Sequence, residues 1–193
     1  MDKLPKDVGR NCVFTALEYL SLKSGIIELR HDIHDINTQS FLSKLLYLVE
    51  RNTPTAKILI TSPGGSVYQA NAMFDRLIWA HHHGTKSIGI VEGFAASAAS
   101  MIVLQGCTQR LATPTARLHM HEPSQWIVLE QLKASTLDDE VKEMQALTKN
   151  IVKVIACRAH KSETEVFEFF KRRERWMSAK EALDWGFIDG IYL

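Results

Sequence analysis

The chain has 193 residues, 46% of them hydrophobic, which is enough to bury one sizeable core but short for two. Lysine and arginine total 23 against 22 aspartates and glutamates, so the formal net charge of +1 indicates neither a nucleic-acid partner nor an anionic membrane surface. The N-terminus is polar and no apolar run approaches the length that spans a bilayer. We therefore expect a single domain over residues 1–193, with no signal peptide or membrane anchor, in a cytoplasmic protein.

In the first half of the chain, strand-like and helix-like patterns alternate, which is typical of βαβ units and a largely parallel sheet in an α/β fold. Glycine supplies the helix stops, with Gly25 after the first helix and Gly84 after the third. The expected elements are a helix over 14–23, a strand over 26–29, a helix from 37 or 38 to about 51, a strand over 58–60 and a helix over 67–83.

The second half continues with a strand over 88–91, which leads into Gly93 and Ser97, and with a long helix over 137–159. Apolar residues recur along that helix at alternating three- and four-residue spacing. They are Val141, Met144, Leu147, Ile151 and Val154. So small a domain should not cover a helix of this length completely, and an exposed apolar stripe usually marks an interface.

Two capping boxes then predict two short helices near the C-terminus. In each, a serine is followed three residues later by a glutamate, Ser162 with Glu165 and Ser178 with Glu181. Gly186 should end the second of these helices before a strand-like segment over 187–193.

The segment from Gly93 to Met101 places Ser97 among small residues, between an apolar strand and an apolar helix. A serine hydroxyl is a weak nucleophile at neutral pH and needs an exposed turn, a general base and donors for the oxyanion that it generates. The strand, sharp turn, serine and helix follow in the order of a nucleophile elbow. The G-x-S-x-G motif of α/β-hydrolases is absent, so we expect a fold different from theirs.

Two further segments could complete such a site. Ser62-Pro63-Gly64-Gly65 follows a predicted strand, and Met120-His121-Glu122-Pro123 ends another apolar run. Each motif alone has an ordinary structural explanation, because glycine turns and structural histidines are common. Their order and spacing together favour catalysis.

These residues resemble the Clp-type serine peptidases, including the phage-encoded branch whose nucleophile lies in a Gly-x-Ala-Ala-Ser-Ala-Ala-Ser run. The similarity covers about 25–193 in one colinear order, with 1–24 as an N-terminal segment. It implies an α/β fold of the Clp-protease/crotonase type, a spiral of βαβ units with a protruding long helix. The segments that carry it are 26–29, 62–65, 93–101, 120–123, 176–182 and 186–189.

The resemblance implies Ser97 as nucleophile, His121 as general base, and the backbone N–H groups of Gly65 and Ala98 as the oxyanion hole. A Pro-Gly-Gly turn lets the backbone approach a substrate closely, and the first N–H groups of a helix have no intrahelical partner. Ser100 is the rival nucleophile, because the residues around it spell the family's Ala-Ala-Ser-Met. We favour Ser97, since Gly93 four residues before it and Gly106 nine residues after it match the family spacing.

The chain departs from the family at three places. The triad acid is usually an aspartate two residues before the aromatic of the Phe-Met-Ser-Ala motif, and Glu174 holds that position here, before Trp176. A glutamate can also orient an imidazole. The family's glycine-rich strand is replaced by bulkier residues over 124–128, and Ala98 replaces the methionine that usually follows the nucleophile.

Other histidines favour structural interpretations. His81, His82 and His83 are neighbours and do not share a helix face, so we expect no metal site there. His119 alternates with His121 along a strand and should face the same side, and we interpret it as structural.

The resemblance therefore implies a serine endopeptidase that cleaves peptides or unfolded proteins through an acyl-enzyme and needs no cofactor or metal. It also implies a homo-oligomer, a heptameric ring or double ring, that works with an AAA+ unfoldase. No G-x-x-x-x-G-K-[ST] motif occurs, so ATP use would belong to another chain. The alternatives are a catalytically weak or structural ring subunit and a crotonase-like acyl-CoA enzyme.

Overall fold

A computed structural model describes residues 13–122, 134–171 and 173–193 of the chain. The first part of the predicted N-terminal segment and the bulky replacement over 124–128 lie outside these residues. Within the described part, seven strands form one sheet in the order β1-β2-β3-β4-β7, and β5 and β6 extend it beside β3. The strands are β1 Ile26–Leu29, β2 Thr55–Ser62, β3 Lys86–Ala96, β4 Gln109–Ala112, β5 Arg117–Met120, β6 Arg175–Ser178 and β7 Gly190–Ile191.

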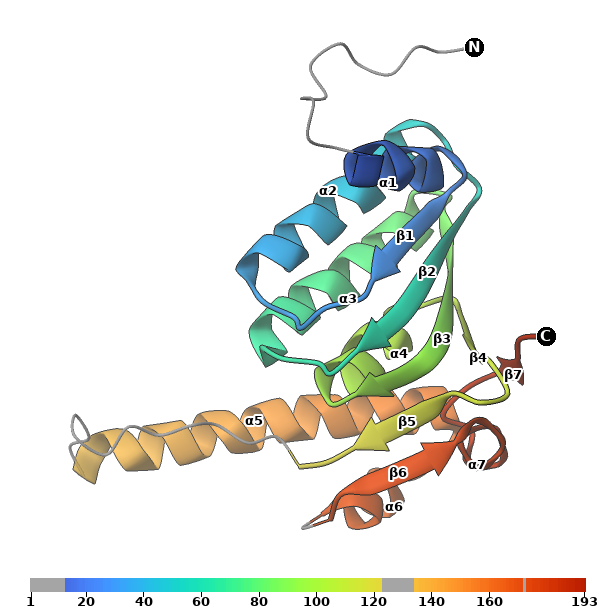
Figure 1. The fold of residues 1–193 in the computed structure, drawn as a ribbon. Coiled ribbons are helices and arrows are strands. Elements are labelled where there is room, and N and C mark those ends of the chain that lie inside the picture. The colour runs from blue at the N-terminus through green and yellow to red at the C-terminus, as the bar shows by residue number, and fades with distance from the viewer. Residues whose placement is uncertain (1–12, 123–133, 172) are drawn as a thin grey trace.

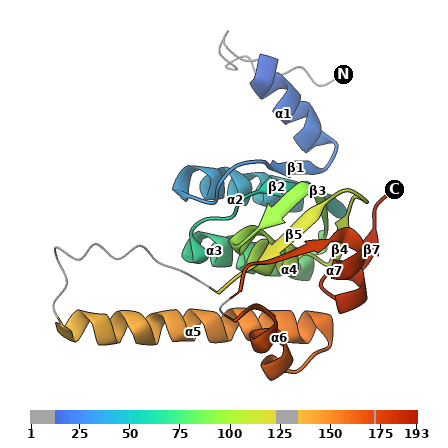
Figure 2. The same ribbon diagram turned by 60° about the horizontal axis from the view of Figure 1, so that its bottom comes forward.

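Helices separate most of these strands, and every described strand pair is parallel except β5 with β6. The predicted α/β class is confirmed. Figure 1 shows α2 and α3 against the first three strands, and Figure 2 shows α5 running past the rest of the fold. The helices are α1 Val13–Lys23, α2 Asp35–Glu50, α3 Val67–His82, the π-helical η1 Ala99–Val103, α4 Leu104–Gly106, α5 Ala134–Ala159, α6 Glu163–Phe170 and α7 Ala179–Trp185.

Local sequence signals set most helix ends. Both capping boxes are confirmed at the starts of α6 and α7, and Gly186 ends α7 in the left-handed conformation at φ 84°. Helix α2 begins two residues earlier than predicted, because the His34 ring accepts a hydrogen bond from the backbone N–H of Ile36 and acts as the N-cap. The strand-like segment over 187–193 yields only the two-residue β7.

Strand β3 is longer than the predicted strand, since it continues through Gly93 to Ala96. Its first half pairs with β4 and its second half with β5. Gly93 lies between the halves at φ 69°, which an L side chain rarely adopts, whereas its side-chain direction is open, with no atom closer than 3.7 Å. Glycine is therefore required here by the backbone conformation of the bend at which β3 changes its pairing partner from β4 to β5.

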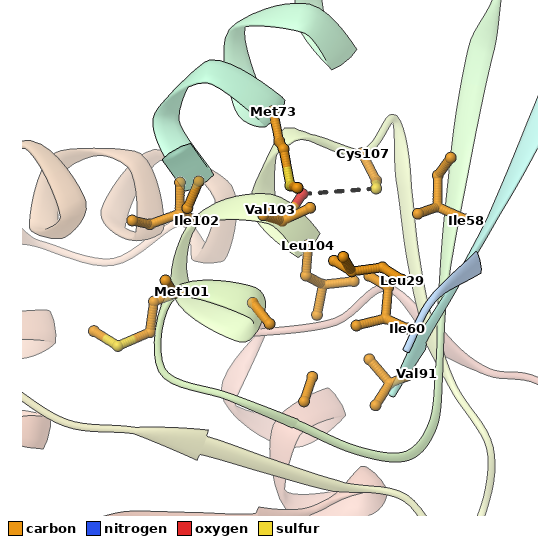
Figure 3. Close-up of a cluster of buried hydrophobic side chains, with 14 of the residues drawn as sticks. Leu29, Ile58, Ile60, Met73, Val91, Met101, Ile102, Val103, Leu104 and Cys107 are labelled. Carbon is orange, nitrogen blue, oxygen red and sulfur yellow. Dashed lines mark hydrogen bonds between the residues drawn. The ribbon is translucent and has the colours of Figure 1, made fainter. Parts of the chain in front are cut away.

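The main core lies between this sheet and the helices that follow it. Figure 3 shows side chains of β1, β2 and β3 meeting Met73 of α3 and the η1 residues. Cys107 also lies here, with its thiol 3.8 Å from the carbonyl oxygen of Val103, and complete burial raises its pKa to about 12. The thiol is therefore protonated and is no candidate nucleophile.

Helix α5 is buried unevenly along its apolar stripe. Leu147 and Ile151 are 8% and 5% exposed, whereas Val141 is 52% exposed. The expected incomplete cover of the helix is therefore found at Val141, whereas the stripe is buried at Leu147 and Ile151. Helix α5 packs on η1, α4 and α6. Among the described residues, no helix combines the length and hydropathy that crossing a bilayer would require.

A polar cluster around the buried Arg110 joins β4 to the residue before β7. Arg110, whose side chain is 4% exposed, pairs with the Asp189 carboxylate and donates to Gln105 Oε1 at 2.8 Å. The backbone N–H of Arg110 also donates to Asp189 Oδ2, at 2.7 Å. Burial alone would raise the pKa of Asp189, but the hydrogen bonds from Arg110 and the charges of Arg110 and Arg158 bring it below its usual value.

We predict that Asp189→Asn destabilises the fold by roughly 2–3 kcal/mol at neutral pH, because it leaves the Arg110 charge buried without its counterion. A lowered folded-state pKa gives stability that is present above the unfolded pKa of about 4 and is lost as pH falls through the folded value. Urea unfolding at several pH values should therefore show the variant and the parent converging below about pH 4. The exposed Asp184→Asn, which removes only a surface pair with Lys180, is the control. Equal stability of parent and Asp189→Asn at pH 7 would contradict this account.

Candidate active site

The pairing of β3 with β5 brings the predicted nucleophile and base together. Ala95 lies opposite Leu118 and Ala96 opposite His119 in this parallel register, and the backbone N–H of Ser97 then donates to the His119 carbonyl oxygen at 3.2 Å. His121 follows directly after β5. Its Nε2 lies 2.7 Å from Ser97 Oγ, a hydrogen-bond distance. Two residues 24 positions apart in sequence are thus placed as a nucleophile and a general base would need to be.

The backbone of Ser97 is strained. Its φ is 52°, in the left-handed region. Among the described residues, only two other non-glycine residues have a positive φ, Asn52 and His160. Those two directly follow the last turns of α2 and α5, where this conformation is common. Ser97 instead lies in the sharp turn between the end of β3 and the start of η1. A sharp turn of this kind is typical of a residue that presents a nucleophilic side chain.

Ser100, the rival nucleophile, lies in η1 and is completely buried. Its hydroxyl lies 2.5 Å from the carbonyl oxygen of His119 and 3.1 Å from that of Ser97, as the donor in both contacts. These contacts tie the start of η1 to β5. The structure thus brings Ser97, and not Ser100, to His121.

The glycine turn after β2 lies against the serine turn. Gly64 and Gly65 have φ values of 91° and 146°, and a Cβ on Gly64 would lie 2.8 Å from the Ser97 Cβ and 2.9 Å from the Ala98 nitrogen. A Cβ on Gly65 would lie 2.4 Å from the carbonyl oxygen of Ile33. The two glycines are therefore required for different neighbours, Gly64 for the serine turn and Gly65 for the loop before α2.

The backbone N–H groups of Gly65 and Ala98 are the predicted oxyanion donors. Among the described residues, neither N–H group donates to a backbone acceptor outside the helices and strands. Gly65 directly follows Gly64, and Ala98 directly follows Ser97. N–H groups beside a nucleophile are what stabilisation of a tetrahedral oxyanion requires.

The expected acid, Glu174, faces His119. Its Oε2 is 2.5 Å from Nε2 of His119, and among the described residues no hydrogen bond or ion pair joins Glu174 to His121. The two atoms are close without hydrogen-bond alignment, and the Glu174 side chain is 71% exposed. The His119 ring stacks on His121, with centroids 5.3 Å apart, and on Trp176, at 4.5 Å. Sequence reasoning interpreted His119 as structural, and its alternation with His121 was the one signal that placed it near the site.

His83 belongs to a separate pair of rings. It lies tilted against Trp79 with ring centroids 4.2 Å apart, and its Nδ1 lies 2.8 Å from the Trp79 carbonyl oxygen. In the described part of the chain, no three histidine, cysteine, aspartate or glutamate side chains are grouped so that they could hold a metal ion.

We predict that Gly64→Ala abolishes hydrolytic activity, because the new Cβ would collide with backbone atoms of the Ser97 turn. Backbone atoms, unlike the end of a flexible side chain, cannot move aside without displacing the turn. Gly84→Ala is a matched control, since Gly84 has the same φ of 91° but a Cβ there would meet no atom within 4 Å. It should lose about 1–2 kcal/mol from backbone strain alone and keep its activity. Peptidase assays together with thermal unfolding of both variants test this, and an active Gly64→Ala would contradict the close packing of the two turns.

Comparison with known proteins agrees with this geometry. A family model described as Clp protease matches residues 10–193. An ATP-dependent Clp protease proteolytic subunit of Porphyromonas gingivalis is 32% identical over 168 residues, which cover 86% of this chain and 72% of that protein. ATP-dependent Clp protease proteolytic subunit 1 of Chlamydia muridarum is 34% identical over 151 residues, which cover 77% of this chain and 76% of that protein.

Proposed function

Because this chain belongs to the Clp protease family, a family of serine peptidases, we propose that it is an endopeptidase in which Ser97 is the nucleophile and His121 the general base. The observation that carries the proposal is the 2.7 Å distance between Ser97 Oγ and His121 Nε2 at a serine held in the left-handed conformation. We propose unfolded proteins and peptides as substrates.

The proposed reaction follows from these positions. His121 Nε2 takes the proton of the Ser97 hydroxyl as the oxygen attacks a peptide carbonyl, and the N–H groups of Gly65 and Ala98 stabilise the oxyanion. The imidazolium then gives its proton to the leaving amine, and an acyl-enzyme remains on Ser97. A water molecule, deprotonated by His121, attacks the ester and restores the free serine.

We predict that Ser97→Ala lowers kcat/KM for a fluorogenic peptide roughly ten-thousand-fold or more, since the hydroxyl forms the covalent intermediate. Ser100→Ala should stay within about tenfold of the parent and lose about 1 kcal/mol of stability, because its hydroxyl contacts only backbone carbonyls. An inactive parent would indicate a structural ring subunit instead. Loss of activity in folded Ser100→Ala with retention in Ser97→Ala would reverse the assignment.

We further propose that the chain works as a ring oligomer beside an ATP-dependent unfoldase. The relatives are named as proteolytic subunits of ATP-dependent proteases, and this chain carries no nucleotide-binding loop of its own. Support within the chain is an apolar groove of about 570 Å³ between α5 and α6, which Val141, Met144 and Phe167 line. Glu122, the neighbour of His121, lines the same groove, so a contact there would reach the active site.

We predict that Val141→Glu reduces oligomer size and peptidase activity together, because an interface would bury an unpaired charge at a cost of several kcal/mol. Val141 is a sharper choice than Leu147, since it is 52% exposed and its replacement leaves the core of the subunit unchanged. Asn150→Glu is the control, since it adds the same single charge at an exposed position of α5 outside the groove. Light scattering of both variants and the parent checks the prediction, and a fully active monomeric parent would refute it.

A further inference from the structure

His119 lies where three parts of the active site meet. Its backbone carbonyl accepts hydrogen bonds from the Ser97 N–H and the Ser100 hydroxyl, and its ring stacks with both His121 and Trp176. Its Nε2 faces Glu174 at 2.5 Å. His119 is 8% exposed, so a buried imidazole separates the exposed carboxylate from the catalytic imidazole. Nothing in the proposed reaction uses this side chain.

The strand register explains the arrangement. In the antiparallel pair of β5 and β6, His119 lies opposite Trp176 and Met120 opposite Arg175, so the next step of the ladder would set His121 opposite Glu174. His119 and His121 lie on the same face of the chain because side chains alternate along a strand. A glutamate opposite His121 is therefore diagonal to His119 and within reach of it, as diagonal pairs commonly are.

We propose that His119 is a positioning residue for the proposed peptidase reaction: it holds the Glu174 carboxylate beside the imidazole pair and fixes the plane of the His121 ring, so that Glu174 acts on His121 through His119. The inference rests on the proposed function. No proton or bond is exchanged at His119. Its ring stacks with both His121 and Trp176, while the carboxylate stabilises the imidazolium that forms when Ser97 gives up its proton.

The charges around His119 fit this role. Burial lowers the pKa of His119 below its usual value, the Glu174 charge opposes this only in part, and His121 lowers it further. His119 is therefore neutral at neutral pH and adds no positive charge beside His121. With the proton on Nε2, the donor of the His119 ring is the atom nearest the Glu174 oxygen, and a rotation of the exposed carboxylate would align the two groups.

A double-mutant cycle tests the inference. His119→Phe keeps an aromatic ring for stacking but removes Nε2, and Glu174→Gln removes the charge. Each should lower kcat by roughly tenfold to a hundredfold with little change in KM, less than the ~10⁴-fold loss typical of a triad acid in direct contact. The double variant should be no slower than the slower single variant, because both changes interrupt one interaction. If His119→Phe keeps full activity, or if Glu174→Gln costs as much in the His119→Phe background as in the parent, the inference is wrong.

Two further readouts separate positioning from a merely structural role. A nearby carboxylate favours imidazolium, so both single variants should move the acid limb of the kcat/KM profile to lower pH by the same amount. His119→Gln, whose amide can still donate to Glu174, should recover part of the activity lost in His119→Phe. An unmoved acid limb, or equal activity of the Phe and Gln variants, would contradict the inference.

The chain offers a control in His83, a histidine that also packs against a tryptophan, in a tilted pair, but is the C-cap of α3. His83→Phe should leave kcat and the pH profile unchanged. Hydrolysis in the unmodified protein must also depend on Ser97. If it does not, the proposed function fails and the inference falls with it, whereas Ser97-dependent hydrolysis with fully active His119→Phe overturns only the role of His119.

Discussion

The site depends on one backbone pairing, that of the second half of β3 with β5. It exists because β3 bends at Gly93 and leaves β4, and it ends with the Ser97 N–H on the His119 carbonyl. That hydrogen bond sets the offset between the serine turn and the chain that carries His121. Without it, neither the 2.7 Å contact between Ser97 and His121 nor the stacked histidines would follow from the rest of the sheet.

A chain of buried polar contacts holds this pairing in place. The Ser100 hydroxyl reaches β5, the Ser100 carbonyl accepts from the Gln105 amide at 3.0 Å, and Gln105 accepts from Arg110, which pairs with Asp189 near the C-terminus. The left-handed conformation of Ser97 costs about 1–2 kcal/mol, which these contacts and the packing of η1 offset. The rigidity of the nucleophile turn therefore depends on residues far from it in sequence.

The sequence predicts most of the elements, because glycine spacing, capping boxes and strand alternation are local signals. The family resemblance singles out Ser97 and His121, which the fold brings within 2.7 Å of each other. The sequence predicts less about features that depend on tertiary partners. The extension of β3 past Gly93 requires β5 beside it, and the burial of Leu147 requires the C-terminal half of α5 to pack on neighbouring elements. Glu174 could face either of two imidazole rings on the same side of the strand, His121 directly opposite or His119 diagonally opposite, and it faces His119. No pattern of residue types distinguishes these two arrangements.

The central claim is that Ser97 is the activated nucleophile, made so by its strained turn and by His121. The most direct measurement is to treat the unmodified protein with a fluorophosphonate and to map the modified peptide by mass spectrometry. The account predicts a single phosphonate adduct on Ser97, formed far more slowly in His121→Ala because the general base is lost. An adduct on Ser100, or labelling of Ser97 that does not depend on His121, would contradict it.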